Sequence, residues 1–179
     1  MTIPNYISFS RLLLVPFVVW FIVNGLYVFA FWMFLGASIS DAIDGYLARK
    51  FSIKSKLGSL LDPLADKVLL VTVAITLGAM DQIPFWLVVL VVSRDIFLIF
   101  AYLTVRKELK GQEIKPSMVS KFNTTFQMAY VTLILINLAF SLRVPDLLYD
   151  ILMYAVAIAT LVSWIGYGKI WLNLLLRKK

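Results

Sequence analysis

Apolar stretches long enough to cross a lipid bilayer follow one another along almost the whole chain. A bilayer-spanning helix needs about 20 mostly apolar residues. Short polar breaks, such as Asn24-Gly25 and Asp81-Gln82, divide the sequence into six segments of this kind. We therefore expect an all-α, polytopic membrane protein with one domain over residues 1–179. The six transmembrane helices are expected at residues 8–24, 27–49, 58–80, 83–106, 117–141 and 147–172.

The composition indicates that the chain lies in lipid, and it limits which catalytic groups and metal ligands the chain can offer. Hydrophobic residues make up 61% of the chain, more than a soluble domain of this size could bury. Cysteine and histidine are absent, which excludes disulfides, thiol catalysis and metal sites built on sulfur or imidazole. A metal ion would have to be held by oxygen, as magnesium, manganese and calcium are. The net charge of +7, on so apolar a chain, favours an anionic membrane surface over nucleic acid as partner.

Basic residues gather after the second and fourth spans and at the C-terminus, whereas the opposite breaks show only Arg143. The positive-inside rule then places both termini in the cytoplasm and puts Asp81 and Arg143 on the far side. The first residues, IPNYISFSRLLL, are amphipathic enough for a helix on the cytoplasmic surface before the first span. The basic residues are Arg49, Lys50, Lys54 and Lys56, then Arg106, Lys107, Lys110 and Lys115, then Arg177, Lys178 and Lys179.

Four carboxylates, Asp41, Asp44, Asp62 and Asp66, lie near the join between the second and third spans. A charged side chain at bilayer depth costs about 2.5–3.5 kcal/mol on insertion scales. Helical spacing places each pair on one face of its helix. The connection over residues 50–57 is short, so we expect the two helices to be antiparallel neighbours with their cytoplasmic ends together. The sequence therefore predicts that the four carboxylates converge near the cytoplasmic face.

Structural readings exist for individual members of this group. Asp62 precedes a proline and could be a helix N-cap, and Asp66 beside Lys67 or Asp44 near Arg49 could form an ion pair. Small residues on the second span could serve helix packing alone. None of these readings explains four carboxylates together. Oxygen ligands without histidine suit a pair of divalent cations, and such pairs act on phosphoryl groups.

The spacing of these residues also resembles the signature of a known family. The pattern Asp41-x2-Asp44-Gly45-x2-Ala48-Arg49-x8-Gly58-x3-Asp62-x3-Asp66 is similar to that of the CDP-alcohol phosphatidyltransferases. The resemblance implies a homodimeric membrane transferase of phospholipid biosynthesis. It would move a phosphatidyl group from CDP-diacylglycerol to an acceptor alcohol and release CMP. Two divalent cations, Mg²⁺ or else Mn²⁺, would be its cofactors.

The resemblance also assigns roles to residues. Asp41 and Asp62 would each contact both metal ions, Asp44 would hold one ion, and Asp66 would hold the other and take the proton of the acceptor. The residues implied in CDP-lipid binding are Asn5, Gly45, Ala48, Arg49 and Ser55.

The acceptor is predicted from the later spans. Arg94 lies within the fourth span, and Lys121 and Asn123 lie near the start of the fifth. These stretches resemble the single-domain cardiolipin synthases of the family, which implies phosphatidylglycerol as acceptor and cardiolipin as product. Glycerol 3-phosphate, the acceptor of phosphatidylglycerophosphate synthases, is the alternative. Structural readings remain, because Lys121 could be an interface anchor and Arg94 could pair with Asp95.

Two other classes of membrane protein also place aspartates inside a helical bundle. A carboxylate-based cation or proton transporter would need acidic groups along a path across the membrane, whereas these cluster at one face. An intramembrane prenyltransferase would bind magnesium and a pyrophosphate. We would expect its aspartates on helices far apart in a longer chain.

Overall fold

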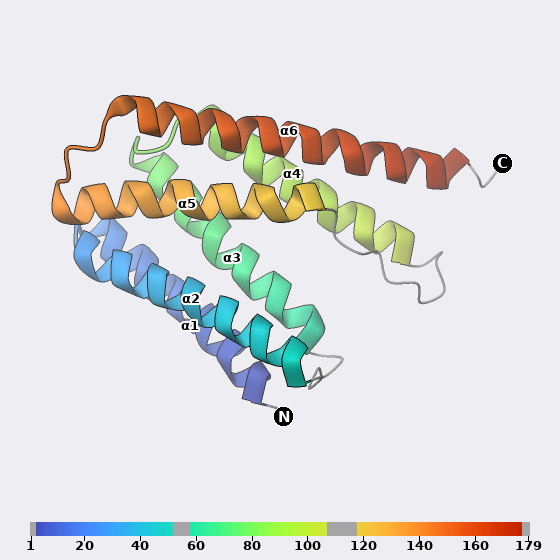
Figure 1. The fold of residues 1–179 in the computed structure, drawn as a ribbon, viewed down its shortest axis with the longest axis horizontal. Helices are drawn as coiled ribbons and strands as arrows, with labels where there is room; N and C mark the ends of the chain where they lie inside the picture. The colour runs from blue at the N-terminus through green and yellow to red at the C-terminus, as the bar shows by residue number, and fades with distance from the viewer. Residues whose placement is uncertain (1–2, 52–57, 107–117, 177–179) are drawn as a thin grey trace. The chain divides into compact units, whose positions relative to one another are not determined.

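The structure is a computed structural model that describes residues 3–51, 58–106 and 118–176. Six helices make up this described part of the protein (Figure 1). Side chains are described for residues 10–40, 67–100 and 120–168. No strand occurs in these ranges, so the expected all-α class is confirmed for them. The helices are α1 (Ile3–Val23), α2 (Tyr27–Phe51), α3 (Gly58–Ala79), α4 (Phe85–Arg106), α5 (Met118–Phe140) and α6 (Asp146–Leu176).

The predicted number of membrane spans is supported only in part. Within the described side chains, two helical segments, Ser120–Phe140 and Asp146–Gly168, are long and apolar enough to cross a membrane. The apolar parts of α1, α2 and α3 with described side chains are shorter than a full span. The Arg94–Asp95 pair interrupts the apolar run of α4. Six helices are therefore present, and six crossings stay a prediction.

Large apolar side chains face outward on α1 and α2. Phe17, Trp20, Phe29 and Trp32 each expose more than half of their surface. Exposed apolar surface on this scale marks contact with a membrane or a partner. It agrees with a membrane environment for the helices.

The chain divides into two compact units, which are described separately. Unit 1 contains α1, α2, α3 and the end of α5 from Val131. Unit 2 contains α4, the beginning of α5 up to Tyr130, and α6.

In unit 1, α1 packs along both α3 and α2, and α2 also contacts α3. The predicted contact between the second and third helices is therefore present, and among the described residues α1 packs against both of them. The buried face of α1 consists of Arg11, Val15, Val18 and Ile22, at the three- and four-residue spacing of one helical stripe. The facing buried residues are Ala30, Phe31, Phe34 and Ala37 of α2 and Leu69, Leu70, Val73, Ala74 and Leu77 of α3.

The expected separate surface helix at the N-terminus is not present. Helix α1 begins at Ile3 and runs without a break into the first apolar segment. No glycine or turn residue separates the two parts, and Pro16 lies inside the helix without ending it. The amphipathic stretch is therefore the first part of α1.

Two helices of unit 1 end in the same backbone motif with different residues. At the end of α1, Gly25 N–H donates to the Ile22 carbonyl and Leu26 N–H donates to that of Phe21, with Gly25 at φ 73°. At the end of α3, Asp81 N–H and Gln82 N–H make the equivalent bonds, and Asp81 has φ 57°. Both are Schellman caps, which favour glycine at this left-handed position. Asp81 therefore carries backbone strain that Gly25 avoids.

In unit 2, α4 packs on α6. Apolar residues of α4, namely Leu87, Val88 and Val91, are buried one to two turns before Arg94. Phe97 and Trp164 meet edge to face with their ring centroids 6.0 Å apart. This apolar packing surrounds a buried polar cluster, which is described below.

Candidate active site

Helices α2 and α3 carry the four predicted metal ligands. Asp41 and Asp44 lie in the last part of α2, and Asp62 and Asp66 lie in the first part of α3. In unit 1, the start of α1, the end of α2 and the start of α3 are at the same end (Figure 1). The backbone therefore brings the two helix segments that bear the carboxylates to one end of unit 1, while the side chains of residues 41–66 lie outside the described ones.

Helical periodicity relates these positions to the core of unit 1. Positions 41 and 44 follow Ala37 by four and seven residues, so they continue the buried stripe of α2. Positions 66 and 62 precede Leu70 by four and eight residues and continue the stripe of α3. These spacings agree with the expected convergence of the four carboxylates, which stays a prediction.

The donor chemistry of this group fits hard divalent cations. Four carboxylates can supply oxygen ligands to two ions, and the chain contains no histidine or cysteine that would favour a softer metal. Among the described side chains there is no cluster of three or more metal-ligating groups. Asp41, Asp44, Asp62 and Asp66, whose side chains lie outside the described ones, stay the predicted ligands of the ions.

The predicted CDP-lipid residues share this end of unit 1. Gly45, Ala48 and Arg49 follow the carboxylates along α2, and Asn5 is in the first turn of α1. Their side chains lie outside the described ones. Ser55 falls between α2 and α3, outside the described residues altogether.

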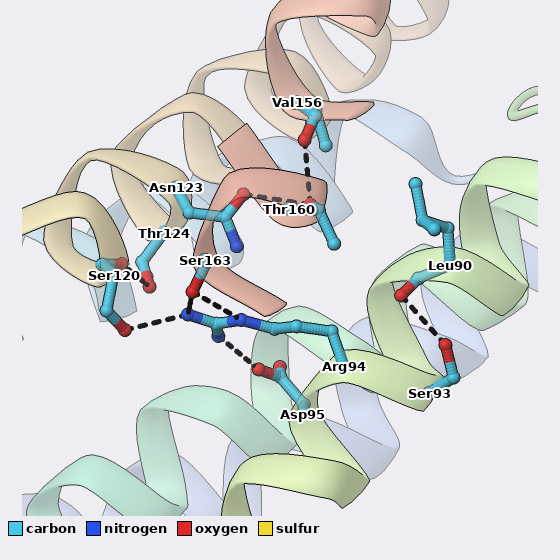
Figure 2. Close-up of polar contacts among 10 residues, drawn as sticks. All are labelled: Leu90, Ser93, Arg94, Asp95, Ser120, Asn123, Thr124, Val156, Thr160 and Ser163. Carbon is cyan, nitrogen blue, oxygen red and sulfur yellow. Dashed lines mark hydrogen bonds and ion pairs between the residues drawn. The ribbon is translucent and has the colours of Figure 1, made fainter. Parts of the chain in front are cut away.

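A second group of polar residues, all with described side chains, centres on Arg94 of unit 2 (Figure 2). Arg94 is 1% exposed. Its Nη1 donates to Asp95 Oδ1 at 2.5 Å, and its Nη2 donates to Ser120 Oγ and Ser163 Oγ, both at 2.7 Å. Its Nε is 3.2 Å from the same Ser163 oxygen. The ion-pair reading of Arg94 and Asp95 is therefore confirmed, and the arginine joins α4, α5 and α6.

Asn123 lies beside this network. It is fully buried, and its Oδ1 accepts a hydrogen bond from Thr160 Oγ1 at 2.9 Å. Thr160 Oγ1 is also 2.7 Å from the Val156 carbonyl. Within the described part of the chain, the amide nitrogens of Asn123 and of the buried Gln127 have no hydrogen-bond partner. Unit 2 thus contains buried donors whose hydrogen-bonding capacity is not used by the described residues.

The three predicted acceptor residues are therefore not equivalent. Arg94 and Asn123 belong to one largely buried polar cluster, which we call the Arg94 cluster (Arg94, Asp95, Ser120, Asn123, Thr160 and Ser163). Lys121 is exposed, and so is the neighbouring aromatic residue Phe122. A role for all three in acceptor binding stays a prediction.

Sequence reasoning missed several residues of these regions. Ser120 occurs three residues before Asn123, and Thr160 and Ser163 are three residues apart. This polar spacing inside apolar helices was a usable signal. Arg11 was also missed, although Val15, Val18 and Ile22 follow it at the spacing of a buried helix face.

Comparisons with known proteins identify the family. The family model for CDP-alcohol phosphatidyltransferase matches residues 1–169. The chain is 36% identical to the chloroplastic CDP-diacylglycerol–glycerol-3-phosphate 3-phosphatidyltransferase 1 of Oryza sativa, over 94% of this chain and 56% of that protein. It is 30% identical to the CDP-diacylglycerol–glycerol-3-phosphate 3-phosphatidyltransferase of Aquifex aeolicus, over 93% of this chain and 94% of that one.

Relatives named as cardiolipin synthases match as well. The human cardiolipin synthase (CMP-forming) is 34% identical, over 73% of this chain and 48% of that protein. The chain thus spans about half the length of the rice and human relatives and nearly the full length of the bacterial one. The match over residues 1–169 shows that this chain belongs to the CDP-alcohol phosphatidyltransferase family.

Proposed function

We propose that this chain transfers the phosphatidyl group of CDP-diacylglycerol to an acceptor alcohol and releases CMP. Family membership over residues 1–169, together with four aspartates on the facing helices α2 and α3, supports this activity. The Arg94 cluster lacks an acidic pair that could bind two ions, so the carboxylates of α2 and α3 carry the metal-dependent step.

In the proposed reaction, an oxygen of the acceptor forms a bond to the phosphatidyl phosphorus. The bond between that phosphorus and the bridging diphosphate oxygen breaks, and CMP leaves with that oxygen. Asp66 takes the proton of the acceptor hydroxyl. Two divalent cations, when bound by the aspartates, supply positive charge to the diphosphate and the departing CMP. Asn5, Gly45, Ala48, Arg49 and Ser55 bind the nucleotide end of the donor lipid.

The acceptor that we propose is phosphatidylglycerol, which would make the product cardiolipin. The supporting observation is that Arg94 already pairs with Asp95 at 2.5 Å. A glycerol phosphate dianion would need several available cations, and this pairing leaves the Arg94 cluster with little net charge. Buried amide donors at Asn123 and Gln127 suit the hydroxyls and the single charge of a phosphodiester headgroup.

Glycerol 3-phosphate is the second candidate, because relatives with that acceptor in their names match as well as the cardiolipin synthases do. An assay of purified protein with CDP-diacylglycerol and each acceptor, measuring CMP and the lipid product, separates the two. We expect phosphatidylglycerol to be used faster, and Lys121→Ala and Asn123→Ala to raise its KM more than they lower kcat. Faster CMP release with glycerol 3-phosphate would establish the second candidate.

We also propose that the protein is a homodimer with both termini in the cytoplasm. The basic residues near the ends of α2 and α4 support this orientation. Single cysteines introduced at positions 81 and 143 should react with an impermeant thiol reagent only from outside the cell, and one at 179 only after the membrane is opened. Labelling of positions 81 and 179 from the same side would reverse this conclusion.

A further inference from the structure

Unit 1 buries one charged side chain among those the structure describes, and sequence reasoning did not assign it a role. Arg11 of α1 is only 2% exposed. It continues the stripe formed by Val15, Val18 and Ile22, which packs against α3 and α2. A guanidinium keeps its charge when buried, so its burial requires an anion close by.

The acidic residues of unit 1 restrict what this anion can be. They are Asp41, Asp44, Asp62, Asp66 and Asp81. Asp81 follows the C-terminal end of α3 and is exposed, at the end of the helix opposite to its start at Gly58. The other four lie in the end of α2 and the start of α3, at the end of unit 1 where α1 begins.

The level of Arg11 along α1 also matches the carboxylate positions. Arg11 is eight residues after the first residue of α1, and Asp66 is eight residues after the first residue of α3. At a rise of 1.5 Å per residue, both lie about 12 Å from the start of their helices. Asp44 is seven residues before the end of α2, which corresponds to about 10 Å.

We propose that Arg11 is a positioning residue of the active site, which neutralises and orients the carboxylates at the joined ends of α2 and α3. This inference rests on the proposed metal-dependent function of those carboxylates. The burial of Arg11 on the packed face of α1 indicates that it acts through protein groups rather than by direct contact with the lipid substrate. Lys67 of α3 is a second described cation near this end of unit 1, and it is only half-buried.

Thermal unfolding of the full-length protein in detergent, with EDTA or with saturating Mg²⁺, distinguishes this role from simple packing. Arg11→Met removes one positive charge beside the four carboxylates. It should lower the unfolding temperature strongly in EDTA and much less in Mg²⁺, because the bound ions supply the missing positive charge. The Mg²⁺-induced rise should therefore be larger than in the wild type. Arg11→Lys, which keeps the charge, should show a rise close to that of the wild type.

Arg143→Met, which removes an exposed cation of the same unit, is the matched control and should leave both temperatures unchanged. If Arg11→Met lowers the unfolding temperature equally in EDTA and in Mg²⁺, the proposal is overturned, since packing does not depend on the metal. If wild-type protein shows the Mg²⁺ response but no CMP release, the proposed function fails, and Arg11 remains only a residue that orients the metal-binding carboxylates.

Arg11→Met could fail to fold, so a charge-balanced variant is the second measurement. Removing one carboxylate in the same background, as in Arg11→Met/Asp66→Asn, should restore folding in EDTA. Failure of all four Asp→Asn partners to restore it would also overturn the proposal. In the folded variants, Arg11→Met should lower CMP release by about 10- to 100-fold at saturating Mg²⁺, as loss of groups that orient metal ligands does, and Arg11→Lys should recover part of it.

Discussion

Each unit of the protein buries an arginine, and the two arginines differ in what neutralises them. Arg94 of unit 2 is surrounded by its own partners, with Asp95 at 2.5 Å and two serine hydroxyls at 2.7 Å. The proposed partners of Arg11 in unit 1 are the carboxylates of the metal site on α2 and α3, whose side chains lie outside the described ones. A buried arginine with local partners ties helices together, whereas one facing a surplus of acidic groups is coupled to whatever those groups bind.

Metal removal should have the largest effect on activity, because the proposed metal ligands all lie in unit 1. EDTA should reduce CMP release to background, because the diphosphate then loses the positive charge that stabilises its departure. Mg²⁺ or Mn²⁺ should restore the rate, and EDTA saturated with Mg²⁺ beforehand is the control. Full activity in excess chelator would remove the basis for assigning the chemistry to unit 1.

Substitution of Arg94 should be costly in a manner that does not depend on metal. Arg94→Met removes the cation that pairs with the buried Asp95, and we expect a loss of about 3–5 kcal/mol in the free energy of unfolding. The loss should be the same in EDTA and in Mg²⁺, in contrast to that of Arg11→Met. It is measured by chemical unfolding under both conditions.

The double variant Arg94→Met/Asp95→Leu is the control for this prediction. Replacing both charges by apolar groups of similar size should recover much of the lost stability. A loss for Arg94→Met that Mg²⁺ reverses would mean that the two arginines are not distinct. Such a result would mean that metal binding changes how much the Arg94 cluster contributes to the free energy of unfolding.

The smallest expected effect concerns backbone strain, which the described residues other than glycine show only in unit 1, at Asp81 and Ser141. Asp81→Gly gives the α3 cap the residue that the α1 cap already has at Gly25, and we expect a gain of about 0.5–1 kcal/mol in unfolding free energy. Asp81→Ala should lower stability, because alanine tolerates this positive φ less well than aspartate, whose short polar side chain can hydrogen-bond locally. A loss on Asp81→Gly, measured by the same unfolding assay, would show that the Asp81 side chain contributes more than the strain costs.

Local sequence signals predicted the helices well. The breaks at Asn24-Gly25 and Asp81-Gln82 coincide with the ends of α1 and α3, because glycine and short polar residues suit the left-handed cap. The helices predicted at residues 27–49 and 58–80 correspond to α2 and α3, which contain Asp41, Asp44, Asp62 and Asp66. These features depend on a few neighbouring residues, and so they can be read from the chain directly.

Features that depend on distant contacts could not be predicted in this way. Arg94 and Ser163 are 69 positions apart, and nothing local to either residue indicates their hydrogen bond. The first residues of the chain were predicted as a possible surface helix, and no role was assigned to Arg11, whose burial depends on contacts of α1 with α2 and α3. The division of the chain into two units, with α5 shared between them, also has no local sequence signal.

The most direct test of the account compares CMP release by wild-type protein and Asp66→Asn, with CDP-diacylglycerol and phosphatidylglycerol in saturating Mg²⁺. Loss of a group that takes the acceptor proton should lower the rate by at least about 100-fold. Binding of CDP-diacylglycerol should be largely retained, because Asp41, Asp44 and Asp62 remain. Turnover by Asp66→Asn at a rate close to that of the wild type would contradict the assignment of the reaction to the carboxylates of α2 and α3.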